Sequence, residues 1–256
     1  MKAMLNATLR ALGVAALLSA SSVTGLAQVQ YPQKPIKAVQ GFAVGGNADT
    51  IARLIGSEMA KALNQAVVVE AVTGVGGTLG SAAVSRAAPD GYTLLLATGG
   101  HAVSGALYEK LPYDTVKSFE MVSAITYFPF LVVVNNDSKL RNFQELLAAG
   151  RSSEGLAYPS RWLGMPEVAT VGEQGVPGYD VRSWAGWMLP AGTPPAIVNK
   201  LNEATRQALI VPQVRSQLRT MGGEAQASSP KEMTTLVEQE VKKWKQVVND
   251  AGIAKS

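Results

Sequence analysis

The chain has 256 residues, a formal net charge of +4, 16% charged residues and no cysteine. The lack of cysteine excludes a disulfide framework, a thiolate nucleophile and a cysteine-based metal site. A charge balance this small, with charged residues scattered along the chain, gives no indication of a nucleic-acid partner. A hydrophobic core must therefore hold the chain together, arranged as one domain or as two small ones.

The first 27 residues have the pattern of a secretory signal peptide. Lys2 and Arg10 form a charged start, Ala11–Ala20 is an apolar run, and small residues lead up to Ala27. A membrane anchor is the alternative, but it needs about 20 consecutive apolar residues, and polar residues from Ser21 onward interrupt the run. The sequence therefore predicts export and cleavage after Ala27. Loss of two basic residues and no acidic one lowers the net charge from +4 to +2.

Strand-like and helix-like patterns alternate between residues 35 and 98. The expected strands are rich in β-branched and apolar residues, and the longer helix has apolar residues on one face. The strands are expected at 36–42, 66–72 and 92–98, and the helices at 48–63 and 81–88. Asn47 or Asp49 is expected to cap the first helix. Strands and helices in turn predict βαβ units and a parallel sheet.

The second half of the chain is less regular. It contains an expected loop at 112–119, strands at 130–134 and 184–189, a short helix at 143–149, and an unpatterned stretch at 150–164. Proline at the start of a helix predicts two further helices, one from Thr193-Pro194 to residue 209 and one at 212–221. Ser229-Pro230-Lys231-Glu232 is a capping box that opens a long final helix. Trp184 and Trp187 are interpreted as either cleft or core residues.

Three glycine-containing loops follow the three expected strands. Gly41–Asp49 precedes a helix, so its backbone N–H groups and the helix dipole can hold a carboxylate or phosphate, although an ordinary strand-to-helix turn is equally compatible. Gly74–Gly80 approaches a dinucleotide fingerprint, but its third glycine comes one residue late and no suitable acidic residue follows. Thr98–His101 completes the set. Ligands of open α/β sheets lie beyond the carboxyl ends of the strands, where these loops are expected.

His101 is the only histidine of the chain. Alone it cannot form a zinc site or a catalytic triad, so it is either a satisfied structural side chain or a donor that contacts a ligand. Motifs for a serine nucleophile, a metalloprotease or a pair of catalytic carboxylates are missing from the sequence. The sequence predicts no enzyme, no metal and no cofactor; an α/β enzyme that uses His101 remains the alternative.

Short motifs follow one another along most of the mature chain. They are Tyr31-Pro32-x-Lys34-Pro35-Ile36, Gly45-Gly46-x-x-Asp49, Val67-Val68-Val69-Glu70, Gly74–Gly80, Arg86-Ala87-Ala88-Pro89-Asp90-Gly91-Tyr92-Thr93-Leu94-Leu95, Leu107-Tyr108-x-Lys110-Leu111-Pro112-Tyr113-Asp114, Gly175-Val176-Pro177-Gly178-Tyr179, Pro190-Ala191-Gly192-Thr193-Pro194 and Ala251-Gly252-Ile253. In this order they resemble the Bug family of periplasmic receptors, the binding components of tripartite tricarboxylate transporters.

The resemblance implies an α/β, periplasmic-binding-protein-like (type II) fold with two α/β lobes around a cleft. It places the first lobe at 28–105 and about 225–256, and the second at 106–224, shortened around 150–164. It implies a monomer in the periplasm that binds a small organic anion of the carboxylate type and delivers it to a membrane permease. The ligand-binding residues that it implies are Phe42, Ala43, Gly45, Gly46, Asp49, Gly74, Gly76, Gly77, Thr98 and His101.

The chain departs from the family pattern between Leu147 and Met165. The family has several dozen more residues there, including a Ser/Gly/Asn-rich loop with a histidine and a Tyr-Lys-Gly loop, which supply the second lobe's side of the cleft. A truncated second lobe is therefore expected, and it raises the alternative of a relic that binds nothing. An interaction module that only contacts a membrane partner is the third possibility.

Overall fold

The structure is a computed structural model that describes residues 31–130, 136–152, 171, 173–176, 179 and 181–256. The expected signal peptide, the expected strand at 130–134 apart from its first residue, and residues 153–164 of the unpatterned stretch lie outside the described residues. All elements below belong to one compact unit, Pro32–Ser256.

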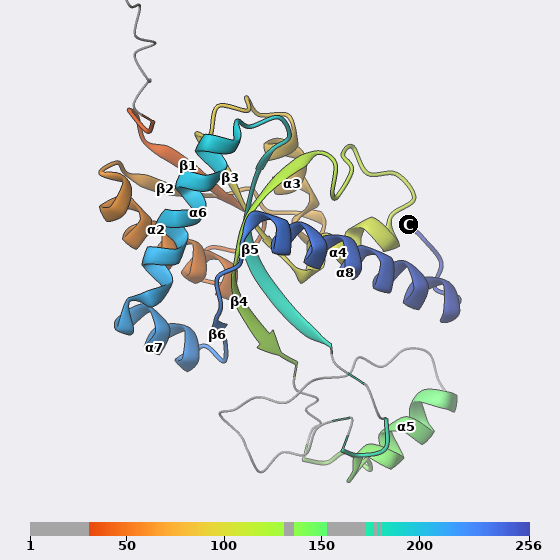
Figure 1. Cartoon of the computed structure of the whole chain (residues 1–256). Coiled ribbons are helices and arrows are strands. Elements are labelled where there is room, and N and C mark those ends of the chain that lie inside the picture. Colours follow the sequence, from red (N-terminus) through yellow and green to blue (C-terminus); the bar gives the residue numbers. More distant parts are fainter. Residues whose placement is uncertain (1–30, 131–135, 153–170, 172, 177–178, 180) are drawn as a thin grey trace, which may run out of the picture. The chain divides into compact units, whose positions relative to one another are not determined.

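The first half of the unit forms the predicted parallel sheet. β1 (Ile36–Gln40) lies between β2 (Val67–Ala71) and β3 (Thr93–Thr98) and pairs with both in parallel. α2 (Asn47–Leu63) connects β1 to β2, and α3 (Thr78–Ser85), preceded by the 3-10 turn η1 (Val75–Gly77), connects β2 to β3. Parallel crossovers are right-handed. The first crossover leads from β1 to β2 at the edge of the sheet, and the second leads from β2 back past β1 to β3. The two crossovers run in opposite directions along the sheet, so their helices cover opposite faces (Figure 1).

Three more strands extend the same sheet. β4 (Phe119–Pro129), β5 (Arg182–Pro190) and β6 (Glu224–Ala225) complete the order β2-β1-β3-β5-β4-β6. β5 is antiparallel to β3 and to β4. Strands from both expected lobes are thus hydrogen-bonded within one sheet, so the expected division at 105/106 and 224/225 cuts through it. The expected loop at 112–119 is present up to Ser118, whereas β4 was not predicted.

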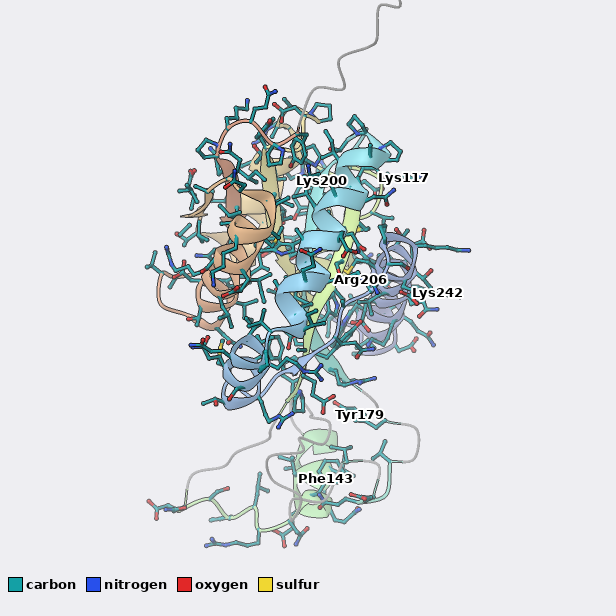
Figure 2. The ribbon with its side chains drawn as sticks, turned by 60° about the vertical axis from the view of Figure 1, so that its left-hand side comes forward. Lys117, Phe143, Tyr179, Lys200, Arg206 and Lys242 are labelled. Atoms are coloured by element: carbon teal, nitrogen blue, oxygen red, sulfur yellow. The ribbon has the colours of Figure 1, made fainter. Side chains whose placement is uncertain are left out.

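The remaining helices of the sheet's two faces pack in pairs. α6 (Pro195–Ile210) contacts α2 and β4 on one face and leads into α7 (Pro212–Thr220), while α4 (Gly99–Leu107) and α8 (Pro230–Asp250) contact each other on the other face. The predicted capping box of α8 is confirmed: Ser229 Oγ accepts a bond from Glu232 N at 3.2 Å, and Ser229 N donates to Glu232 Oε2 at 2.7 Å. Figure 2 shows Lys200 and Arg206 on the outward face of α6, which is exposed.

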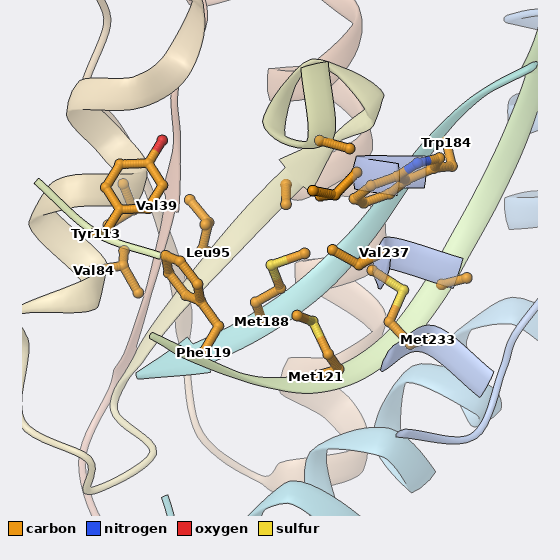
Figure 3. Close-up of a cluster of buried hydrophobic side chains, with 14 of the residues drawn as sticks. Val39, Val84, Leu95, Tyr113, Phe119, Met121, Trp184, Met188, Met233 and Val237 are labelled. Carbon is orange, nitrogen blue, oxygen red and sulfur yellow. The ribbon is translucent and has the colours of Figure 1, made fainter. Parts of the chain in front are cut away.

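The main core lies between the sheet and α8 (Figure 3). Trp184 and Trp187 are 1% and 0% exposed, so both are core residues and the cleft alternative does not hold for them. Gly186 between them allows α8 to approach, because a Cβ there would lie 2.5 Å from Met233 Cε. The described members of this core all come from residues up to Tyr127 or from Trp184 onward.

A separate hydrophobic cluster lies in the segment between β4 and β5. α5 (Phe143–Ser152), predicted at 143–149, buries Phe143 and Leu146 together with Val171. Leu140, Leu147, Val176 and Tyr179 pack against them, and Figure 2 labels Phe143 and Tyr179 in this segment. The segment therefore has a small core of its own. None of the helices in the described part of the chain has the length and apolarity required to cross a membrane.

Candidate functional site

The three glycine loops meet at the carboxyl edge of β1, β2 and β3. A Cβ on Gly41 would lie 2.5 Å from Gly77 Cα, and a Cβ on Gly80 would lie 3.3 Å from Gly41 Cα. A Cβ on Gly100 would lie 3.9 Å from the carbonyl oxygen of Gly76. The loops after the three strands are thus in mutual contact, as their parallel arrangement requires.

The loop after β2 has an unusual backbone. Gly74, Val75, Gly76 and Gly77 have φ values of +134°, +47°, +62° and +93° in succession. A β-branched residue at positive φ is strained, and strain of this kind gathers at functional sites. The loop is closed by a hydrogen bond of 3.0 Å from Gly77 N to Gly74 O, and Val75 is 53% exposed. This geometry makes the loop a rigid wall of the edge.

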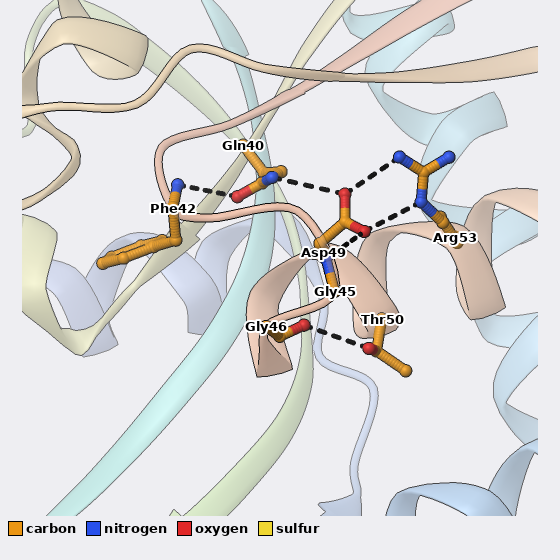
Figure 4. Close-up of polar contacts among 7 residues, drawn as sticks. All are labelled: Gln40, Phe42, Gly45, Gly46, Asp49, Thr50 and Arg53. Atoms are coloured by element: carbon orange, nitrogen blue, oxygen red, sulfur yellow. Dashed lines mark hydrogen bonds and ion pairs between the residues drawn. The ribbon is translucent and has the colours of Figure 1, made fainter.

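Asp49 organises the loop after β1 (Figure 4). Its Oδ2 accepts bonds from Gly45 N at 3.0 Å and Arg53 Nε at 2.9 Å, and its Oδ1 accepts from Arg53 Nη2 at 3.1 Å and Gln40 Nε2 at 3.3 Å. Phe42 N donates to Gln40 Oε1 at 2.7 Å. The Arg53 guanidinium, together with the Gly45 N–H, holds the pKa of this carboxyl below its usual value despite its burial. Asp49 is 2% exposed, and these partners account for both of its oxygens.

The first turn of α2 presents backbone donors. Gly46 is the N-cap residue, without a side-chain cap, so neither Asn47 nor Asp49 is the cap that the sequence predicts. The first bond of the helix runs from Thr50 N to Gly46 O at 2.9 Å. Within the described residues, the N–H groups of Asn47 and Ala48 have no backbone or side-chain acceptor. Such groups at a helix N-terminus, with the helix dipole behind them, attract an anion.

A pocket of about 820 Å³ opens at this turn. The β3–β5–β4 ladder supplies one wall, because Ala185 pairs with Thr98 on one side and with Thr126 on the other. The end of α7 supplies another. The lining residues are Phe42, Ala43, Gly46, Asn47, Ala48, Ile51, Thr98, Phe128, Pro129, Phe130, Ser183, Ala185, Thr220, Met221 and Gly222.

The expected ligand-binding residues divide between this pocket and its surroundings. Phe42, Ala43, Gly46 and Thr98 line it. Gly76, Gly77 and His101 line a second, much smaller pocket that also includes Phe42 and Thr98. Gly45, Asp49 and Gly74 line neither pocket. The walls from β4, β5 and α7 were not found from the sequence, because no local motif marks them.

His101 is a buried structural side chain in this structure. It is 5% exposed; its Nε2 lies 2.9 Å from Thr115 O and its Nδ1 lies 3.1 Å from Ser81 Oγ. A carbonyl only accepts, so Nε2 carries the proton and Ser81 donates to Nδ1. The rings of Tyr113 and Phe119 pack on His101 at 5.7 and 5.1 Å between centroids. Burial lowers the pKa of His101 to about 4, so the ring is neutral at pH 7.

The chemistry of the edge is therefore that of binding. Its donors are the backbone N–H groups of the α2 turn and a few uncharged polar side chains, and most of its lining is apolar. Ser81 and His101 lie side by side, but a buried imidazole of low pKa is a weak base, and its second nitrogen faces a carbonyl instead of a carboxylate. Among the described residues, acidic side chains and the histidine form no group that could hold a metal ion.

Comparison with known sequences gives a consistent set of relatives. The profile of the tripartite tricarboxylate transporter family receptors matches residues 51–165 and 159–253. A UPF0065 protein of Bordetella bronchiseptica is 28% identical over 314 aligned positions, which cover 95% of this chain and 93% of that protein. A UPF0065 protein of Agrobacterium vitis is 28% identical over 315 positions, covering 93% and 91%. These alignments are longer than the chain itself, so the relatives contain residues that have no counterpart here, as the expected truncation requires.

Solved structures share the fold. MatC from Rhodopseudomonas palustris, with bound malate, superposes with a TM-score of 0.77 at 28% identity, covering 85% of this chain and all of that one (100%). The periplasmic binding protein BugD superposes with a TM-score of 0.79 at 24% identity, covering 88% and 100%. The fold is therefore α/β and periplasmic-binding-protein-like, as the sequence predicts.

Proposed function

The chain belongs to the family of tripartite tricarboxylate transporter receptors, and from this membership we propose that it is an extracytoplasmic receptor for a small organic anion. The proposal covers binding of a carboxylate-type ligand, location in the periplasm after removal of residues 1–27, and delivery of the ligand to a membrane permease. Related receptors are periplasmic binding proteins, and MatC holds malate.

One observation carries the binding part of the proposal: the uncapped first turn of α2 opens into the 820 Å³ pocket. Asn47 and Ala48 line that space at the N-terminus of a 17-residue helix, which carries the positive end of the helix dipole. A carboxylate placed there receives charge-assisted hydrogen bonds, which are about twice as strong as neutral ones. Asp49 lies in the same turn, but the Arg53 guanidinium neutralises it, so it does not repel an anion strongly.

The expected site residues take two roles in this proposal. Phe42, Ala43, Gly46 and Thr98 contact the ligand, because they line the pocket. The other six, Gly45, Asp49, Gly74, Gly76, Gly77 and His101, hold the loops in place. We assign no catalytic role to His101, because its ring nitrogens are engaged with Ser81 and Thr115.

The second lobe in this proposal is the segment between β4 and β5. It leaves the sheet after Pro129 and returns at Arg182, and it has its own hydrophobic cluster. The six strands and the helices around them then form the first lobe, and the receptor acts as a monomer. A relic that binds nothing is the rival possibility, and the ligand test below decides between the two.

Replacement of Asn47 by proline tests the site directly. Proline at the first helical position removes one N–H without breaking a helix, and the preceding Gly46 already has the extended backbone, φ −73° and ψ 174°, that proline requires of its neighbour. We expect Asn47→Pro to weaken carboxylate binding about tenfold or more, since a hydrogen bond to a charged group contributes about 1.5–3 kcal/mol. Isothermal calorimetry of the mature protein with malate, citrate, adipate and hexanoate gives the affinities.

The matched control is Asn47→Ala, which removes the side chain but keeps the N–H. It is expected to lose much less affinity than Asn47→Pro, because the backbone donor is retained. Equal weakening by alanine and proline would show that the amide is not a ligand donor. If the parent protein releases no heat and shows no thermal shift with any of these acids, the receptor proposal fails and the relic remains.

A further inference from the structure

We propose that the pocket at α2 selects a monocarboxylate with an apolar body over dicarboxylates and amino acids. This inference rests on the proposed function, because it takes the N-terminus of α2 as the place of the first carboxylate. It concerns the rest of the ligand, which the backbone donors do not specify.

The walls of the pocket are apolar beyond the α2 turn. Phe42, Ile51, Phe128, Phe130 and Met221 supply the largest side chains. They come from the loop after β1, from α2, from the end of β4 and from the end of α7. Burial of an apolar ligand surface against them stabilises a complex by about 25 cal/mol for each Å² removed from water. The body of the ligand is thus recognised by the hydrophobic effect.

Among the described lining residues, no side chain carries a charge that could pair with a second charged group of the ligand. The described lining residues include no lysine, arginine, histidine, aspartate or glutamate. Asp49, in the first turn of α2, is paired with Arg53 at 2.9 Å and accepts from protein donors with both oxygens. Arg182, next to the lining residue Ser183, lies over the ring of Tyr127 at 5.7 Å. A second carboxylate or an ammonium group would lose its hydration without an ionic partner, and such desolvation opposes binding.

The polar groups of the described lining are sufficient to bind one carboxylate. Asn47, Thr98, Ser183 and Thr220 contribute an amide and three hydroxyl side chains to the lining; these groups can orient a ligand but do not neutralise a charge. Ligand pockets are commonly mostly apolar, with a few placed polar groups that fix the orientation of the ligand.

Hexanoate and adipate provide the matched test, because they share the same six-carbon chain and differ only in the second carboxylate. Calorimetry of the mature protein is expected to give hexanoate a dissociation constant at least about tenfold lower than that of adipate, a difference of about 1.4 kcal/mol. Equal affinities, or tighter binding of adipate, would overturn the inference while leaving the receptor proposal intact. Failure of hexanoate, adipate, malate and citrate alike to bind would refute both.

A positive charge introduced into the pocket lining tests whether the lack of charged lining residues sets the preference. Phe130 lines the pocket and is 44% exposed, so Phe130→Arg is tolerated and supplies a partner for a second carboxylate. We expect this variant to bind adipate about tenfold more tightly than the parent and hexanoate less tightly. Val68→Arg, at a 55% exposed position on β2 outside the pocket lining, is the charge-matched control and leaves the preference unchanged. An equal gain in adipate affinity in both variants would attribute the effect to net charge and contradict the assignment.

Discussion

His101 is a residue whose role could not be assigned from the sequence alone. As the only histidine, beside a glycine loop, it was a candidate ligand contact. The structure joins it to Ser81 of α3 and to the carbonyl of Thr115 ahead of β4, so it links α3, α4 and the segment before β4. The sequence left both possibilities open. The contacts with Ser81 and Thr115 support the structural one, although the residue also lines the smaller pocket.

The burial of His101 predicts a dependence of stability on pH. Its pKa is lowered to about 4 in the folded protein from 6.5, so the unfolded chain binds more protons between these values. Stability is therefore full above pH 6.5 and is lost as the pH falls toward 4. A shift of this size corresponds to about 3 kcal/mol of unfolding free energy. Urea denaturation at pH 7 and at pH 4.5 measures the loss.

Titration of the His101 ring, followed by NMR, checks the lowered pKa directly. Because the chain has one histidine, the untagged protein has a single pair of imidazole C–H signals in the proton NMR spectrum. Its midpoint is expected near pH 4 in the folded state. A midpoint between 6 and 7 would show that the ring is solvated and that Ser81 and Thr115 do not hold it.

At the scale of elements, the fit between the glycine loops is the feature that positions the site. Gly41 and Gly77 approach so closely that a Cβ on Gly41 would lie 2.5 Å from a backbone atom. Gly41→Ala is expected to lower the unfolding free energy by about 1–3 kcal/mol, because backbone must move to relieve the overlap, and to weaken ligand binding. Thermal denaturation and calorimetry measure the two effects.

Gly100→Ala is the matched control for this change. A Cβ there would meet only Thr98 Oγ1 at 3.5 Å and Gly76 O at 3.9 Å, which are ordinary contacts, and alanine favours the helix α4 by about 0.5–1 kcal/mol over glycine. The control should be at least as stable as the parent. Comparable destabilisation by both alanines would mean that the loops do not depend on the Gly41–Gly77 approach.

The elements that could be predicted are those marked by a pattern within their own residues. The βαβ units and the capping box of α8 were predicted, because periodicity and caps lie within a few residues of each element. β4 was missed, since its register shifts between Met121 and Ser123 and between Ala124 and Thr126 break the alternation that marks a strand. The pocket wall was missed for another reason. Phe128 and Met221 meet there because β4 pairs with β6, a contact between segments far apart in sequence.

At the scale of the whole molecule, the sheet does not depend on the segment between β4 and β5 for its core. Pro129 and Arg182 are direct partners in the antiparallel ladder, so the chain leaves and re-enters the sheet at one place. The main core takes its described members from outside this segment. The lobe boundary that we propose at 129/182 was not predicted from the sequence, because the family motifs run through both parts.

Replacing residues 130–181 with Asn-Gly, a two-residue hairpin turn, is expected to leave a folded first lobe. Its melting temperature should stay within about 5 °C of the parent, because the main core is retained, while ligand affinity falls with the loss of Phe130. Circular dichroism and dye binding report the outcome. A non-cooperative melt with dye binding, as in a molten globule, would show that the sheet needs the segment. The full-length core variant Met188→Asp, at a 0% exposed position, serves as the disrupted reference.

The paired exit and return at Pro129 and Arg182 also has an evolutionary consequence. The entropic cost of closing the loop between two neighbouring strand ends rises only slowly with loop length. Insertions and deletions at this place therefore change the stability of the sheet little. Lineages that gain or lose residues between these two strands can change this segment while inheriting the glycine loops unchanged. If the proposed receptor function holds, selection can then alter ligand preference in one interval of the chain without changing the loops at the edge of the sheet.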